Sequence, residues 1–98
     1  MHLKWTDEVS NDLEQIESFI SVNNSFSVAV DVVLRVIDTT ELVLIEYPHS
    51  GRPGRAKATR ELVIDDLPFI VIYRINFSDI QILRVLHEAQ QWPVNAKK

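Results

Sequence analysis

The chain has 98 residues, of which 46% are hydrophobic and 24% are charged, and it contains no cysteine. This length and composition are typical of one globular domain, and they exclude a disulfide framework and a thiolate metal site. Ten Lys and Arg residues against 14 Asp and Glu give a net charge of −4, made up of −7 over residues 1–50 and +3 over residues 51–98.

A strand and a helix are predicted at the start of the chain. Residues 2–5 alternate as a short strand, with Leu3 and Trp5 on one face. Thr6 is placed as an N-cap, and acidic residues follow in the first turn, where the helix dipole favours them. Apolar residues then recur at helical spacing: Val9, Leu13, Ile16 and Ile20. Three acidic residues are expected on the opposite, solvated face: Asp12, Glu14 and Glu17.

A second helix is predicted after a polar connection over residues 23–25, and it begins near Ser25 or Ser27. One stripe of this helix is formed by Ala29, Val33, Val36 and Thr40. Valine-rich segments form poor isolated helices, so packing must stabilise this one. Pro48 and Gly51 end the helical unit.

Three strands are predicted in the second half of the chain, over residues 60–64, 69–75 and 80–86, with turns at 65–68 and 76–79. The middle strand is nearly all apolar, as expected for a strand buried on both faces. If the second turn has an even number of residues, alternate residues of the two strands that it joins share one face of the sheet. These are Phe69, Val71, Tyr73 and Ile75 of the middle strand and Ile80, Ile82, Arg84 and Leu86 of the last strand. An odd turn would exchange the two faces.

The order strand, helix, helix, strand, strand, strand predicts an α+β fold with two helices packed on one face of a small antiparallel sheet. No further element remains to cover the other face. We expect that face to be either a groove for another protein or an aggregation hazard. Residues 91–98 are expected to fray.

Positive charge is concentrated in residues 51–60, which carry Arg52, Arg55, Lys57 and Arg60 and no acidic residue. The glycines of this segment do not form a phosphate-binding P-loop, because the Gly-Lys-Ser/Thr ending and the following helix are absent. The segment is either a mobile connector or a contact for a polyanionic partner.

Targeting and metal-binding signals are absent from the sequence. The N-terminus lacks the charged and then apolar pattern of a signal peptide. No apolar run approaches the roughly 20 residues of a membrane span. Because the lack of cysteine suits a reducing compartment, we expect a cytoplasmic protein without membrane contact. His2, His49 and His87 are too scattered to predict a zinc site, and no cofactor is expected.

Six pieces of the sequence form an ordered set: Trp5, DLEQI at 12–16, GRPGR at 51–55, TRELV at 59–63, LPFIVIYRI at 67–75 and ILRVLHEAQQWP at 82–93. Together they resemble toxins of the RelE/ParE superfamily of type II toxin–antitoxin systems. The resemblance covers nearly the whole chain as one domain, residues 1–98. It implies a small bacterial toxin of this fold that a cognate antitoxin neutralises by wrapping onto it, with a homodimer or a toxin–antitoxin hetero-oligomer as the assembly.

The superfamily holds two activities. RelE-like members cleave messenger RNA on the ribosome, and ParE-like members inhibit DNA gyrase. RelE-like nucleases carry an arginine three residues before the strand tyrosine, a place that Ile70 takes before Tyr73 here. The acidic net charge and the ending over residues 82–87 also resemble the ParE-like branch. We therefore favour a non-catalytic gyrase inhibitor. An mRNA endonuclease and a non-toxic interaction domain of the same fold are the alternatives.

The chemistry of the side chains predicts two alternative sets of site residues. A nuclease would use an acid or base, a positioning hydroxyl and arginines that hold the phosphate. This set is His87, Tyr73, Arg60 and Arg84. The partner-binding set is Arg52, Arg55, Lys57, Arg60, Arg74, Arg84 and Trp92. Structural alternatives are a hydrogen-bonded His87, arginines at 74 and 84 that pair with Glu61 and Asp79, and Trp92 as a core plug. Ala58 replaces a glycine common in these toxins, which is expected to stiffen the loop.

Overall fold

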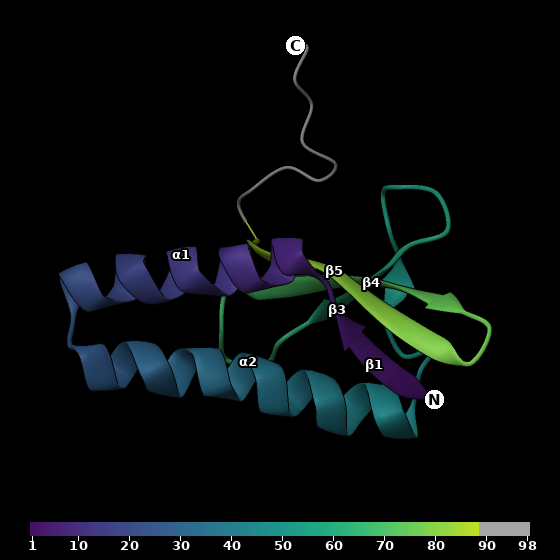
Figure 1. Cartoon of the computed structure of the whole chain (residues 1–98), viewed down its shortest axis with the longest axis horizontal. Helices are drawn as coiled ribbons and strands as arrows, with labels where there is room; N and C mark the ends of the chain where they lie inside the picture. The colour runs from purple at the N-terminus through teal and green to yellow at the C-terminus, as the bar shows by residue number, and fades with distance from the viewer. Residues whose placement is uncertain (89–98) are drawn as a thin grey trace, which may run out of the picture.

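A helical hairpin packs against a curved five-stranded sheet in the computed structural model, which describes residues 1–88 (Figure 1). The elements in chain order are β1 (His2–Trp5), α1 (Asp7–Asn23), α2 (Phe26–Glu46), β2 (Arg52–Pro53), β3 (Arg60–Val63), β4 (Phe69–Asn76) and β5 (Asp79–His87). The predicted α+β fold and its order of elements are confirmed, with one short strand added. The segment expected to fray, residues 91–98, lies outside the described residues.

Both helices begin where the sequence predicts, but only α2 has a side-chain cap. Ser25 Oγ accepts a hydrogen bond from Val28 N at 3.3 Å, which satisfies one of the free N–H groups of the first turn. Thr6 occupies the N-cap position of α1, yet its hydroxyl donates to Ile82 O at 2.9 Å. Thr6 therefore ties the start of α1 to β5. Neither described helix combines the length and the hydropathy needed to cross a membrane.

The sheet has the strand order β1-β5-β4-β3-β2 and is mixed, where the sequence predicts an antiparallel one. β1 runs parallel to β5, and all other neighbours are antiparallel. A parallel neighbour needs a long crossover connection, which the helical hairpin and the intervening strands supply. The added strand is β2, in which residues 52–53 of the basic segment pair with residues 60–61 of β3.

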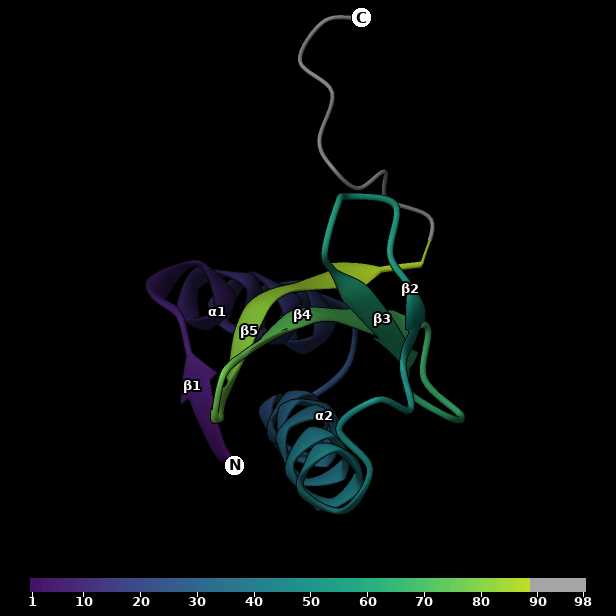
Figure 2. The same ribbon diagram turned by 90° about the vertical axis from the view of Figure 1, so that its right-hand side faces the viewer.

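The core lies between the helices and the inner face of the sheet. Figure 2 shows the sheet curving around α2, with α1 beside β5. The buried residues of this core are Val9, Val36, Leu44, Ile64, Phe69, Val71, Tyr73, Ile80, Ile82 and Val85. Thr40 of α2 is also buried, and its hydroxyl donates to Val36 O at 2.7 Å. The polar group within the apolar stripe is therefore satisfied.

A β-bulge divides β5 into two halves that present opposite sets of side chains. Near the turn, Tyr73 lies opposite Ile82, as predicted for an even turn. The register then shifts, because Leu83 is an extra residue in β5. Beyond it the pairs are Ile72–Arg84, Val71–Val85, Ile70–Leu86 and Phe69–His87. The prediction that Arg84 and Leu86 share a face with Tyr73 is therefore wrong.

The outer face of the sheet is closed where the sequence predicts an open apolar surface. Ile70, Ile72 and Leu86 are 6%, 1% and 4% exposed, and they pack with Leu83 as a second small cluster. The expectation of an uncovered apolar sheet face is therefore wrong. Large apolar side chains are exposed mainly on the helices: Phe19, Val22, Phe26, Val28, Leu34, Leu42 and Ile45.

Candidate partner-binding surfaces

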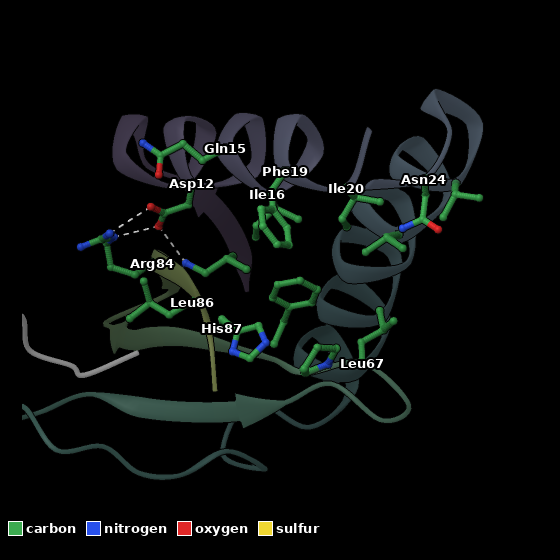
Figure 3. Close-up of a pocket in the computed structure, with 15 residues that line it drawn as sticks. Asp12, Gln15, Ile16, Phe19, Ile20, Asn24, Leu67, Arg84, Leu86 and His87 are labelled. Atoms are coloured by element: carbon green, nitrogen blue, oxygen red, sulfur yellow. Dashed lines mark hydrogen bonds and ion pairs between the residues drawn. The ribbon is translucent and has the colours of Figure 1, made fainter. Parts of the chain in front are cut away.

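An apolar groove runs between α1, the start of α2, the turn before β4 and the end of β5 (Figure 3). Its volume is about 520 Å³. The apolar lining residues are Ile16, Phe19, Ile20, Val28, Val32, Leu67, Pro68, Phe69, Val85 and Leu86. Phe19 is 70% exposed, so the groove is open to a partner. We call this surface the apolar groove.

At one end of the apolar groove, Asp12 of α1 binds Arg84 of β5 (Figure 3). Arg84 Nε and Nη2 donate to the two Asp12 oxygens at 2.8 Å and 2.9 Å, and Val85 N donates to Asp12 at 3.0 Å. The hydrogen bonds to Asp12 raise the pKa of the Arg84 guanidinium. Asp12 is 8% exposed, so the prediction that it lies on the solvated face of α1 is wrong.

His87 ends β5 and lines the apolar groove, where Figure 3 shows its ring. Its imidazole meets the Phe69 ring edge to face, with centroids 5.8 Å apart and an interplanar angle of 86°. His87 itself is exposed, so it is an accessible aromatic side chain at the groove.

Residues 51–60, which we call the cationic hairpin, fold against a buried carboxylate. Glu61 is 3% exposed, and its Oε1 accepts hydrogen bonds from Arg52 Nε at 3.2 Å and Nη2 at 3.0 Å. Its Oε2 accepts from the backbone N of Arg55 at 3.2 Å and lies 3.6 Å from Arg55 Nε. Glu61 thus holds two residues of the predicted partner-binding set. Arg74 instead donates to Gln81 Oε1 at 2.7 Å, Arg84 pairs with Asp12, and Asp79 pairs with Lys4. The predicted pairing of Arg74 and Arg84 with Glu61 and Asp79 is therefore wrong.

Tyr73 and Arg60 fasten the connection between α2 and β2. The Tyr73 hydroxyl donates to Pro48 O at 2.8 Å and accepts from Gly51 N at 2.9 Å. Arg60 Nη1 donates to His49 O at 3.2 Å and to Gly51 O at 2.8 Å. Tyr73 is fully buried, and burial raises the pKa of its phenol. Both side chains therefore hold the backbone that leads into the cationic hairpin.

The tip of the cationic hairpin borders a second, more polar cavity of about 420 Å³. Its charged or titratable lining residues are His49, Arg55, Lys57 and Arg60, and among residues 1–88 no acidic side chain lines it. Lys57 is exposed and forms no ion pair with the described residues. Ala58 has a φ of 63°, a left-handed conformation that favours glycine.

The four residues of the predicted nuclease set do not converge. Arg60 lies opposite Tyr73, whereas His87 lies opposite Phe69. These positions are four residues apart along β4, which is about 13 Å of strand. The Tyr73 hydroxyl is buried against backbone, and Arg84 is bound by Asp12. These four side chains therefore do not bring an acid and a base to one phosphate site.

The remaining predicted site residues are Arg74 and Trp92. Arg74 is exposed beside Gln81 on β5, where a partner can reach it. Trp92 lies outside the described residues. Within residues 1–88, no group of three or more His, Asp or Glu side chains is arranged to hold a metal ion.

Sequence reasoning missed the two carboxylates that organise these surfaces, Asp12 and Glu61. A signal for Asp12 existed, because it stands three residues after Val9 and four before Ile16. Helical spacing places all three on the same face. Glu61 carried no local signal, since its partners are presented to it by pairing between β2 and β3.

Comparisons with known proteins find related sequences and a similar solved structure. The sequence model of the family described as "ParE toxin of type II toxin-antitoxin system, parDE" matches residues 3–92. The Sinorhizobium fredii protein named "Putative toxin Y4kP" is 46% identical over 91 residues, which cover 93% of this chain and 92% of that protein. A solved chain of the "Chromosomal ParDE TA system from P. aeruginosa" matches with a TM-score of 0.82 and 27% identity, over 89% of this chain and 95% of that chain.

Proposed function

Because the chain belongs to the ParE toxin family of type II toxin–antitoxin systems, we propose that it inhibits bacterial growth by binding DNA gyrase and that a cognate antitoxin neutralises it. We favour gyrase over messenger RNA as the target because the four candidate nuclease residues lie apart in the structure. A metal-independent nuclease needs an acid and a base at the same phosphate. The buried hydroxyl of Tyr73 and the distant ring of His87 do not meet that need. The toxin would then act in the cytoplasm as a binding protein.

The apolar groove is the surface that we assign to the antitoxin. Phe19 and Val28 in its lining are 70% and 43% exposed, and exposed apolar patches of this kind mark protein interfaces. A groove beside two helices suits the apolar face of an amphipathic segment. The antitoxin would thus bind beside the helices, because the outer face of the sheet is closed.

A supercoiling assay with purified gyrase tests the target. We expect the purified chain to inhibit supercoiling at micromolar concentration and to leave translated messenger RNA without codon-positioned breaks in primer extension. His87→Ala should inhibit gyrase as well as the wild type, because the proposal gives the imidazole no chemical role.

Three outcomes separate the alternatives. Growth arrest with inhibited gyrase and intact messenger RNA supports the proposal. Uninhibited gyrase with messenger RNA breaks that vanish in His87→Ala would identify a ribosome-dependent endonuclease. Normal growth after induction without an antitoxin would identify a non-toxic interaction domain of the same fold.

A further inference from the structure

We propose that the cationic hairpin, residues 51–60, binds the phosphate backbone of duplex DNA without reading the base sequence. This inference goes beyond the proposed inhibition of gyrase, because it concerns the affinity of the hairpin itself for DNA. It rests on the separation of charge in the molecule, the unused donors at the cavity beside the hairpin, and the lack of aromatic and large aliphatic side chains in residues 51–60.

The charges of the chain are separated between its helices and its hairpin. Residues 7–46, which contain α1 and α2, carry nine acidic residues and one arginine, whereas residues 49–60 carry four cations and no acidic residue. Figures 1 and 2 show the loop of the cationic hairpin projecting from the sheet on the side away from α2. A polyanion can therefore reach the hairpin from the side opposite α2, and the separation of charge between the two halves of the chain orients the encounter.

The cavity at the hairpin tip offers hydrogen-bond donors that the protein itself does not use. Arg60 bonds to its two carbonyls through Nη1 alone, and nothing in residues 1–88 accepts a hydrogen bond from its Nε or Nη2. The Lys57 ammonium also lacks an ion-pair partner in this part of the chain. Guanidinium and ammonium groups with unused N–H groups are the usual ligands of phosphate oxygens.

The arginines are held in position before a ligand arrives. Glu61 accepts two hydrogen bonds from the Arg52 guanidinium and one from the backbone N of Arg55, whose Nε lies 3.6 Å from the carboxylate. Two backbone carbonyls hold Arg60. Groups that are already ordered lose less conformational entropy on binding. Residues 51–61 keep a net charge of +3 after the Glu61 carboxylate is counted, so the internal ion pairs do not neutralise the surface.

The composition of the hairpin favours a duplex over other polyanions. Residues 51–60 contain no aromatic residue and no Leu, Ile, Val or Met. They therefore lack the stacking surface that single strands use and the apolar centre of a protein interface. Binding must rest on charge and hydrogen bonds, which the regular row of phosphates on a duplex satisfies.

Fluorescence anisotropy with a labelled duplex of ~20 base pairs tests the proposal on the full-length chain, between about 50 and 200 mM NaCl. If Arg55, Lys57 and Arg60 each neutralise one phosphate, the slope of log K against log salt should be about −3. Lys57→Gln should weaken binding roughly three- to tenfold and make the slope shallower by about 1. Since Lys57 is exposed and forms no ion pair with any of residues 1–88, this change should not disturb folding.

Lys4→Gln is the matched control, because Lys4 lies on β1 with its side chain 62% exposed and only a 3.5 Å ion pair to Asp79. Equal affinity and slope for Lys57→Gln and Lys4→Gln would overturn the proposal. A duplex that does not bind at ~50 mM NaCl would also overturn it. If polyglutamate displaces the duplex at an equal concentration of charge, the ligand is an acidic polypeptide and the proposal is wrong.

The supercoiling assay separates this inference from the proposed function. A chain that inhibits gyrase but binds no duplex keeps the proposed function and loses only the DNA site. A chain that binds the duplex with the expected slope but leaves gyrase active keeps the DNA site and loses the proposed target.

Discussion

Asp12 takes the place of a neighbouring strand at the edge of β5. β1 pairs with β5 over residues 79–82, and beyond that point the N-terminal chain has already turned into α1. The exposed edge is satisfied by side chains instead, because the Thr6 hydroxyl donates to Ile82 O and Val85 N donates to Asp12. One helical carboxylate therefore both protects a sheet edge and fixes α1 beside it.

Asp12→Asn should lower the free energy of unfolding by about 2 to 4 kcal/mol, because the partly buried Arg84 guanidinium loses its charged partner. Chemical denaturation measures the effect. Glu14→Gln is the control on the same helix, where the side chain is exposed, and it should change stability by less than about 0.5 kcal/mol. An equally small effect of Asp12→Asn would show that the pair does not hold α1 to β5.

The Tyr73 phenol makes the free energy of unfolding decrease at alkaline pH. Burial raises its pKa above the ordinary value of 10.0, so the unfolded chain loses this proton first as the pH rises. The stability that the protonated hydroxyl provides is complete below about pH 10 and decreases as the pH rises from there through the folded pKa. Tyr73→Phe should reduce this pH dependence.

At neutral pH, Tyr73→Phe should lower the free energy of unfolding by about 1 to 3 kcal/mol, because Gly51 N loses its hydrogen-bond acceptor. Urea unfolding between about pH 8 and pH 11 measures both effects. Tyr47 is 64% exposed, so Tyr47→Phe controls for the loss of a tyrosine as such. If Tyr73→Phe kept the full alkaline loss of stability, another group would be its source.

At the scale of elements, the cationic hairpin depends on a close backbone approach at Gly54. Gly54 N donates to Thr59 O at 2.8 Å. A Cβ at Gly54 would collide with Thr59 Oγ1 and would lie 3.0 Å from the Thr59 carbonyl carbon. The hydroxyl could rotate away, but the backbone carbon could not move without opening the hairpin.

Gly54→Ala should therefore destabilise the hairpin by about 1 to 3 kcal/mol and leave the core folded. Hydrogen exchange should show faster exchange over residues 52–61 and unchanged protection in α2 and β4. Ala58→Gly is the opposite substitution in the same hairpin, and it should not weaken protection, since the φ of 63° suits glycine. Unchanged exchange in Gly54→Ala would mean that the hairpin tolerates the Cβ.

The elements were predictable from the sequence where their signal is local. The helical stripe that contains Val9 and Ile16 needs only a period of 3.6 residues to be recognised. The parallel pairing of β1 and the bulge at Leu83 depend on residues far apart in the chain, so no local pattern indicates them. The bulge turns Val85 into the core and Arg84 toward Asp12, which is why the predicted faces fail beyond it.

The sequence predicts where the positive charge of the candidate site is concentrated, but it does not predict how the side chains are arranged. The sequence places Arg52 and Arg55 in one segment with Lys57, but side-chain partners follow from strand pairing. Only the register between β2 and β3 brings Glu61 opposite Arg52. The sequence predicts a groove on the outer face of the sheet, whereas the structure has it beside the helices. The outer face is closed by packing between residues far apart in the chain, which no local pattern indicates.

At the scale of the whole molecule, the apolar and the cationic surfaces lie apart. The tip of the helical hairpin extends beyond the sheet in Figure 1, and it carries Phe19, Val22 and Phe26, which are 70%, 84% and 65% exposed. The cationic hairpin projects from another side of the sheet. The apolar groove and the cavity beside the cationic hairpin share no lining residue, so we expect a partner in the groove to leave that cavity open.

An antitoxin that binds the apolar groove of the folded toxin must raise the toxin's free energy of unfolding. At a free antitoxin concentration about 1,000-fold above Kd, the gain is about 4 kcal/mol. Phe19→Ser should lose most of this gain, because the variant removes an aromatic anchor from the groove. Without antitoxin it should unfold within about 0.5 kcal/mol of the wild type, since Phe19 is largely exposed.

Phe77→Ser is the matched control for this measurement. Phe77 is 94% exposed in the turn between β4 and β5 and does not line the groove, so the variant should keep the full gain. Urea unfolding with and without saturating antitoxin measures both variants. If Phe19→Ser and Phe77→Ser gained equal stability, the antitoxin would have to bind elsewhere, because an occupant of the groove cannot avoid contact with a side chain that lines it.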